Sequence, residues 1–340
     1  MKLSVKDARK LIFGALTGAG TKPENAKYFT EAILDTEMSG LEGHGFYWLQ
    51  YYCAHVQSGK VKGAAKPKIK TISPVSFRID ANWGFAHPAI EQGFAKLVPA
   101  AKKYGIAAMS IHNSYNAATL GFHTGTVARQ GAVCFGFTNA MPVIAPVGGD
   151  TPVIGTNPMS FAVPGPKGKI AFLIDQSSSA VAWTAVKRAA DQRRPIPLGW
   201  ALDKSGKPTT DPNEGLAGSI VPLGGYKGFG LGLMVEVMCA AMTGANLGTQ
   251  MGSFTDNEKP IGCGQFFIAL DPKKFSGGAF DKQIRTLMKS VTKQKGARLP
   301  NSRRESNLKR TLREGLEIDS ALFETLQGYV MGNKKRIKKM

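Results

Sequence analysis

The chain has 340 residues, of which 43% are hydrophobic, enough for one large domain or two to three smaller ones with a real core, and this excludes a disordered protein. Lys and Arg number 44 against 24 Asp and Glu, a net charge of +20 that favours phosphates, small acids or nucleic acid as ligands. Apart from a basic tail at 334–340 the cations are scattered. A solvated cationic surface is the simpler explanation, and a polyanion partner is the alternative.

Apolar spacing predicts the elements in chain order. Residues 5–57 have helical spacing, and Thr21-Lys22-Pro23-Glu24 predicts a capping box within them. Residues 66–80 alternate as strands do, and a β/α alternation follows. Its helices are predicted at 88–103, 121–130 and 180–191, and its strands at 105–111, 132–138, 159–163 and 170–174. A long loop at 192–225 precedes a helix at 227–243, a strand at 265–270 and helices at 281–295 and 318–330.

The cysteines and the apolar segments indicate a cellular setting. Cys53, Cys134, Cys239 and Cys263 show neither CxxC nor zinc-site spacing, so we expect reduced, buried cysteines and no metal. The N-terminus has no apolar segment typical of a signal peptide. The longest apolar stretch, 229–245, contains Glu236 and several glycines and predicts a buried helix rather than a membrane span. We therefore expect a cytoplasmic protein without membrane association.

Two glycine-rich turns predict a ligand site. Gly148-Gly149 precedes Gly155-Thr156-Asn157-Pro158, and Gly224-Gly225-Tyr226-Lys227-Gly228 comes later in the chain. Glycine lets backbone N–H groups approach a ligand, and such turns make concavities that bind anions. No GxGxxG opens a helix after a strand, and no GxxxxGK[ST] is present, so a dinucleotide would bind in a fold other than the Rossmann fold.

Several further motifs carry a family resemblance. They are Glu42-Gly43-His44-Gly45-Phe46, Asn113-Ser114-Tyr115-Asn116, Thr138-Asn139-Ala140, Asp175-Gln176-Ser177-Ser178-Ser179, Pro197-Leu198-Gly199-Trp200 and Pro208-Thr209-Thr210-Asp211-Pro212. With the two glycine-rich turns, their order and spacing resemble the malate/L-lactate dehydrogenase-like oxidoreductases over about residues 3–330. The sulfolactate dehydrogenase and piperideine-2-carboxylate reductase branches look most similar.

The resemblance implies an α/β protein with the family's non-Rossmann fold. A helical, dimerisation domain would be built from 1–75 with 285–335, and a sheet-rich NAD(P)-binding and catalytic domain from 76–284. It also implies a homodimer and hydride transfer between NAD or NADP and a small anionic 2-oxo or 2-imino acid. The positive charge favours NADP slightly, because a 2′-phosphate binds Arg and Lys.

Site residues follow from the same resemblance. His44 matches the proton donor, a role that suits an imidazole near neutral pH, and Asp175 is a second catalytic candidate. Thr156, with Trp48 and Trp183, falls at substrate positions. Matches to cofactor contacts are Ser114, Tyr115, Asn116, Ala117, Ala118, Thr156, Asp175, Gln176, Ser177, Arg303 and Arg304. Lys227, beside open N–H groups at a helix start, is a further cofactor candidate.

The chain departs from the family at several of these positions. Gly43 replaces a Ser that orients the His, and Trp48 replaces an Arg that grips the substrate carboxylate, which removes a bidentate clamp. Asn116 stands where a His is common, and Trp183 and Ala185 where members carry basic, polar or acidic residues. Arg193 replaces a usual Gly.

These departures leave three hypotheses open. The first is an active reductase of 2-oxo or 2-imino acids. The second is a degenerate family member recruited as a non-catalytic binding or structural subunit for RNA or another polyanion. The third is an active enzyme whose pocket has been rebuilt for another substrate.

Overall fold

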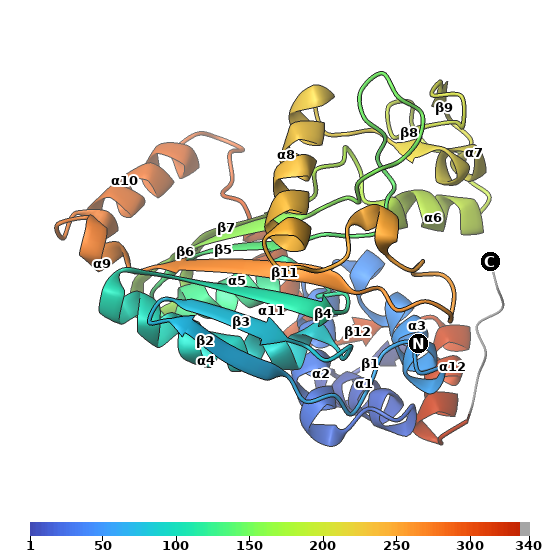
Figure 1. The fold of residues 1–340 in the computed structure, drawn as a ribbon, viewed down its shortest axis with the longest axis horizontal. Helices are drawn as coiled ribbons and strands as arrows, with labels where there is room; N and C mark the ends of the chain where they lie inside the picture. The colour runs from blue at the N-terminus through green and yellow to red at the C-terminus, as the bar shows by residue number, and fades with distance from the viewer. Residues whose placement is uncertain (334–340) are drawn as a thin grey trace.

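A seven-stranded sheet forms the centre of the protein in the computed structural model, which describes residues 1–333; the predicted basic tail at 334–340 lies outside the described residues (Figure 1). The strands, in spatial order, are Lys68–Ser73 (β2), Ser76–Asp80 (β3), Ile106–Ser114 (β4), Cys263–Leu270 (β11), Val133–Thr138 (β5), Met159–Pro164 (β6) and Ile170–Gln176 (β7). Strands β3 and β4 are parallel, and the other neighbouring pairs are antiparallel. The predicted α/β class is confirmed.

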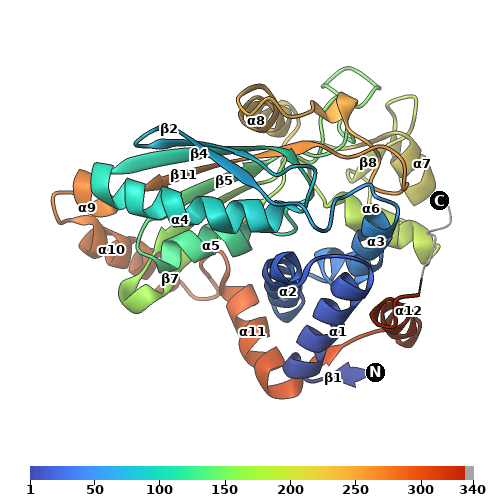
Figure 2. The same ribbon diagram turned by 60° about the horizontal axis from the view of Figure 1, so that its bottom comes forward.

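Helices Ala86–Tyr104 (α4) and Leu120–Arg129 (α5) cover one face of the sheet (Figure 2). Gly93 lets α4 approach closely, because a Cβ there would lie 2.5 Å from both Met109 Sδ and Ile79 Cδ1. Phe94 of α4 packs edge-on against Phe267 of β11, with ring centroids 5.1 Å apart. This layer is therefore a tightly packed base for the strand ends.

Helix Tyr226–Glu236 (α8) and the π-helical turn Val237–Ala241 (η3) lie on the opposite face of the sheet (Figure 2). Val235 and Cys239 pack there with Phe137 and Phe266. The prediction that the helix over 229–245 is buried is wrong for the side that faces away from the sheet. Within residues 1–333 no other element covers that side. Large apolar side chains are exposed along that side: Tyr226, Leu233, Met234, Val237 and Met242.

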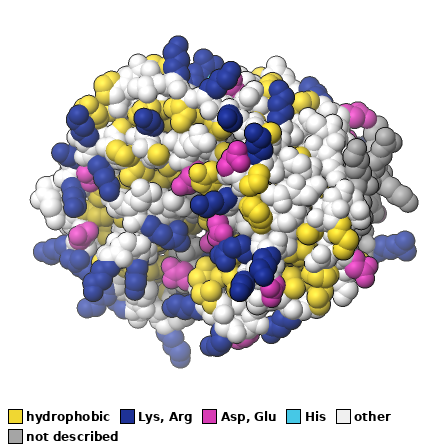
Figure 3. Space-filling view, turned by 90° about the horizontal axis from the view of Figure 1, so that it is seen from below, with side chains coloured by type: hydrophobic (Ala, Val, Ile, Leu, Met, Phe, Trp, Pro, Cys, Tyr) yellow, Lys and Arg dark blue, Asp and Glu magenta, His cyan; other side chains and the backbone are white. Residues whose placement is uncertain are grey.

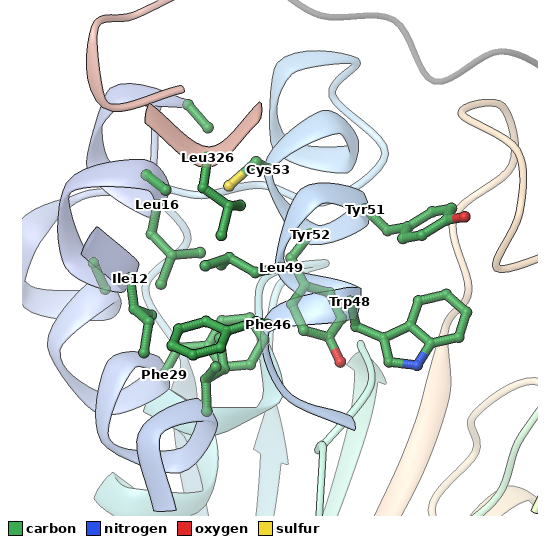
Figure 4. Close-up of a cluster of buried hydrophobic side chains, with 14 of the residues drawn as sticks. Ile12, Leu16, Phe29, Phe46, Trp48, Leu49, Tyr51, Tyr52, Cys53 and Leu326 are labelled. Carbon is green, nitrogen blue, oxygen red and sulfur yellow. The ribbon is translucent and has the colours of Figure 1, made fainter. Parts of the chain in front are cut away.

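A helical region is built from both ends of the chain. It contains Val5–Gly18 (α1), Pro23–Met38 (α2), Phe46–Gln57 (α3), Ser302–Glu314 (α11) and Ser320–Val330 (α12), and the antiparallel pair Lys2–Leu3 (β1) and Leu316–Glu317 (β12). Its core includes Ile12, Leu16, Leu49 and Leu326, which converge between α1, α3 and α12 (Figure 4). The predicted capping box is absent: Lys22 is the N-cap, and the buried Thr21 hydroxyl has no hydrogen-bond partner.

The remaining elements lie outside these two parts. The predicted loop at 192–225 contains Ala201–Leu202 (β8), Pro208–Thr209 (β9), Pro212–Ala217 (α7) and Ser219–Ile220 (β10), which gather beside Trp183–Asp191 (α6). Pro272–Phe275 (α9) and Phe280–Thr292 (α10) extend away from the helical region (Figure 1). The division into 1–75 with 285–335 and 76–284 stays a prediction, although β2 already places Lys68–Ser73 in the sheet.

Candidate active site

A cavity of about 520 Å³ lies where the helical region meets one end of the sheet. The register brings the last residues of β4, β5 and β7 and the first residues of β6 and β11 to this same end of the sheet. Ser114 pairs with Cys263, and Met159 pairs with Gln176. Eleven of the residues predicted for the site line the cavity: His44, Trp48, Asn116, Ala117, Ala118, Thr156, Asp175, Gln176, Ser177, Trp183 and Arg304. Segments distant in sequence are thereby assembled around one space.

His44 ends a short 3₁₀ helix, Glu42–His44 (η1), that leads into α3. Burial lowers the pKa of His44 below its ordinary value of 6.5, the charge of Asp175 raises it, and Arg304 and Arg188 lower it further. Burial therefore favours the neutral imidazole of His44, and the protonated ring, when it forms, is a stronger acid than a free imidazolium.

Asp175, at the end of β7, joins three elements. Its Oδ2 accepts hydrogen bonds from the backbone N–H of Gly121 in the first turn of α5 (3.0 Å) and from Arg304 Nη1 of α11 (2.9 Å). Asp175 therefore accepts a hydrogen bond from the N-terminal turn of α5 and also neutralises Arg304 at the cavity.

The buried carboxylate of Glu236 stabilises the turn that carries Thr156. Asn157 donates to Gly232 O (2.9 Å) and to Glu236 Oε2 (2.7 Å), and accepts from the backbone N–H of Ala140 (3.1 Å). Glu236 Oε1 also accepts from the Gly248 N–H (2.7 Å). Glu236, a single charge within an apolar stretch of the sequence, thereby links α8 to the turn that carries Thr156.

The segment after β4 has two kinds of residue. Asn116 Oδ1 accepts from the Ala118 N–H (2.6 Å) and lies 3.4 Å from the Tyr52 hydroxyl, so Asn116 shapes the cavity wall. Ser114 and Tyr115 are buried and are not among the cavity-lining residues. The Tyr115 hydroxyl instead forms a hydrogen bond with His55 Nδ1.

Two predicted cofactor residues lie on the surface. Lys227 is exposed in the first turn of α8, and Arg303 is exposed on α11, one position before Arg304. Neither lines the cavity.

Three of the predicted departures from the family, Gly43, Trp48 and Trp183, lie at or beside one wall of the cavity. A Cβ on Gly43 would lie 2.9 Å from Thr184 Oγ1, so the threonine hydroxyl stands close to where a serine side chain would begin. Trp48 packs edge-on against Phe254, with centroids 4.8 Å apart, and lies 6.3 Å from Trp183. Phe254, with Met141 and Ile261, was missed because it belongs to a loop without periodic pattern.

A second recess of about 350 Å³ adjoins the first and shares Arg304 with it. Besides Arg304 its cations are Arg129, Lys169 and Lys309, and two carboxylates, Asp35 and Glu305, also line it. Burial raises the pKa of Asp35, while Arg129 and Arg304 lower it. The recess is therefore a cationic extension of the cavity.

The surface charge is dispersed on the face shown in Figure 3, where Lys and Arg alternate with apolar and uncharged side chains. That face presents no continuous cationic stripe of the kind a polyanion needs. The four cysteines are free and buried, as predicted. Within residues 1–333 no helix is long and apolar enough to cross a membrane, and no three His, Cys, Asp or Glu side chains are grouped to hold a metal.

Known proteins resemble this chain over nearly its whole length. The profile of the malate/L-lactate dehydrogenase family matches residues 3–327. A (2R)-3-sulfolactate dehydrogenase (NADP⁺) of Chromohalobacter salexigens is 38% identical over 97% of this chain and 98% of its own. A Δ¹-pyrroline-2-carboxylate reductase of Ancylobacter novellus is 36% identical over 96% and 97%. The crystal structure of Δ¹-piperideine-2-carboxylate reductase from Pseudomonas syringae superposes with a TM-score of 0.90, at 31% identity and with coverage of 97% and 99%.

The fold, the cavity and these matches define an enzyme of the oxidoreductase class. The chain belongs to the malate/L-lactate dehydrogenase family, and the family predicted from the motifs is confirmed. The predicted fold is confirmed by the same structural match.

Proposed function

We propose that this enzyme reduces a small 2-oxo or cyclic 2-imino acid at the expense of NADPH or NADH, with His44 as the proton donor. The observation that supports this most is the convergence of the His44 imidazole with the hydroxyl and amide groups of Thr156, Gln176 and Ser177 around one cavity. The relatives named as dehydrogenases and reductases of small acids favour the same reaction.

The residues present fit a nicotinamide dinucleotide. Thr119 and Leu120, at the start of α5, line the cavity, and the start of this helix suits a phosphate oxygen; the next N–H, that of Gly121, and Arg304 are both bonded to Asp175. When bound, the reduced nicotinamide supplies a hydride to C2 of the substrate. His44 then holds the proton that the oxygen or nitrogen on C2 takes up, and the carboxylate of Asp175 stabilises the imidazolium form before that transfer.

The proton-donor role is tested by His44→Gln. We expect kcat of reduction to fall about 100-fold or more, since general acid catalysis contributes about that much. The absorbance of the reduced nicotinamide reports the rate with pyruvate, oxaloacetate, sulfopyruvate and cyclic imino acids. His112→Gln is the matched control, because His112 lies on β4 and does not line the cavity. Equal loss in both variants, or no loss at His44, would refute the role.

We also propose that NADPH is preferred over NADH. The cationic recess at Arg129, Lys169 and Lys309 adjoins Arg304 and could receive a 2′-phosphate. In a thermal-shift titration NADPH should raise Tm at lower concentration than NADH, and Arg129→Gln with Lys309→Gln should reduce this difference. An unchanged difference would place the 2′-phosphate elsewhere.

We further propose a homodimer that covers the exposed apolar side of α8. Leu233, Met234 and Val237 follow one another at helical spacing on that side, and a closed two-fold pair is the commonest oligomer. Light scattering should give twice the chain mass, and Val237→Glu should shift it toward the monomer.

A further inference from the structure

One wall of the cavity is aromatic. Trp48 is central to it, edge-on to Phe254 at 4.8 Å and inclined by 32° to Trp183 at 6.3 Å between ring centroids. Tyr52 extends the wall, since its ring lies 5.9 Å from that of Phe254. All four rings line the cavity, and so does His44, which lies four residues before Trp48 in the sequence, so the wall and the proposed proton donor share one cavity.

Trp48 presents carbon surface to the cavity. Its single donor, Nε1, is used in a 2.6 Å hydrogen bond to Gly43 O. The indole is 4% exposed and also packs against Tyr51, with centroids 4.7 Å apart. Figure 4 shows Trp48 and Tyr51 projecting from α3 away from the helical core. The indole is therefore fixed in place and has no donor to offer an anionic group.

A buried ammonium group anchors the loop that carries Phe254. Lys60 has a fully buried side chain, and its Nζ donates to Ser253 O, to Asp256 O (2.8 Å) and to Asp256 Oδ1 (2.8 Å). These three bonds use its three donors. Phe254 lies between the two anchored residues, so the loop presents its ring in one position before any ligand binds.

The cavity is poor in cations. Arg304 is the single Lys or Arg among the described lining residues, and Asp175 neutralises it at 2.9 Å. A sulfonate or a second carboxylate placed against this wall would thus meet aromatic rings, which is unfavourable; Arg188, near Gly43, is not among the lining residues. An aromatic side chain would gain edge-to-face contacts with the same rings.

We propose, on the basis of the function proposed above, that the substrate is a monocarboxylate whose side chain is an aromatic ring or a planar apolar group of similar size. Trp48 and Phe254 determine this specificity, and Lys60 is a positioning residue that acts through Phe254. Among the 2-oxo acids covered by the proposed function, those with a short or a second anionic side chain are then reduced more slowly than phenylpyruvate.

Binding tests the inference without turnover. With saturating NADP⁺, calorimetry compares 3-phenylpropionate, propionate and succinate, none of which can be reduced at C2. We expect 3-phenylpropionate to bind about tenfold or more tightly than either, a difference typical of filling an apolar pocket. Propionate or succinate binding as tightly as 3-phenylpropionate would overturn the inference.

Variants locate the effect. Phe254→Ala should lose most of the preference, Phe254→Leu should keep part of it, and Trp48→Arg should shift it toward succinate. Lys60→Met should weaken 3-phenylpropionate binding as Phe254→Ala does while leaving propionate binding unchanged. Phe275→Ala is the control, since that exposed ring on α9 is remote from the cavity. A preference that survives Phe254→Ala would also overturn the inference.

Turnover separates this inference from the proposed function. Faster reduction of phenylpyruvate than of pyruvate and oxaloacetate supports both. Reduction of oxaloacetate or pyruvate as fast as phenylpyruvate leaves the proposed function standing and overturns the aromatic specificity. Preferential binding of 3-phenylpropionate with no oxo acid or imine reduced overturns the proposed function and retains the aromatic subsite.

Discussion

His44 and Asp175 are coupled by charge although they come from different parts of the chain. Asp175 raises the pKa of His44 against the effects of burial, Arg304 and Arg188. The carboxylate also neutralises Arg304. Its removal would therefore lower the pKa of His44 in two ways, by the loss of a negative charge and by leaving the Arg304 charge uncompensated.

We therefore expect Asp175→Asn to lower the pKa of His44 further. The proposed mechanism requires the protonated imidazole, so under it the rate falls as pH rises through this pKa, and the fall should begin at lower pH in the variant. The pH profile of kcat/KM measures the shift, and Asp281→Asn, exposed on α10, is the control. A shift to higher pH would contradict this electrostatic explanation.

Arg193 illustrates what a residue type alone can reveal. The resemblance predicts a glycine as the usual residue at this position, and Arg193 has a φ of 50°, in the left-handed region that favours glycine. The resemblance identified the position, and the backbone supplies the physical reason.

At the scale of elements, the sequence predicted what periodic apolar spacing can report. Strands β3–β7 and helices α4, α5 and α12 lie close to the predicted ranges. Helix α11 was missed because Ser302–Glu314 is almost entirely polar, with Leu308 and Leu312 as its apolar residues. Two-residue strands such as β8 and β9 are too short to show alternation.

The site was predictable where motifs are local. His44, Thr156 and Asp175 were identified by resemblance, and the structure brings them to one cavity. Phe254 and Lys60 were not identified, because their pairing with distant residues depends on how the loop after α8 folds back onto α3, and no local pattern encodes that contact.

Glu236 is the residue on which the packing of α8 against the Thr156 turn depends. Glu236→Ala would leave the buried donors of Asn157, Asn139 and Gly248 without their acceptor, and we expect the free energy of unfolding to fall by about 3 kcal/mol or more. Denaturant titration measures this loss. Glu236→Gln, which keeps one carbonyl oxygen, should lose less, and the exposed Glu324→Ala on α12 should lose almost nothing. Equal losses for Ala and Gln would argue against the hydrogen bonds.

At the scale of the whole molecule, buried histidines link stability to pH. Burial lowers the pKa of His55 to about 3 and that of His123 to about 4, and it lowers the pKa of His87 well below 6.5. Both ring nitrogens of His87 are buried without a hydrogen-bond partner, and its ring stacks on Phe29 at 4.1 Å.

Below about pH 6.5 the unfolded chain binds protons at these histidines that the folded chain does not. Stability should therefore be complete above that pH and decline progressively toward about pH 4. His87→Phe removes one such group, so its advantage over the wild type should be larger at about pH 5 than at about pH 8 in chemical denaturation. An advantage independent of pH would mean that His87 acts through packing alone.

The pairing of β1 with β12 also bears on how the protein is made. Leu3 lies opposite Leu316, and the N-terminal ammonium donates to Ile318 O at 2.8 Å. The apolar sides of α1 and α3 that pack against α12 stay open to the solvent until the ribosome has released that late segment. During biosynthesis there is thus an interval in which this exposed apolar surface is available to chaperones. A transcript cut short before α12 would yield a chain prone to aggregate.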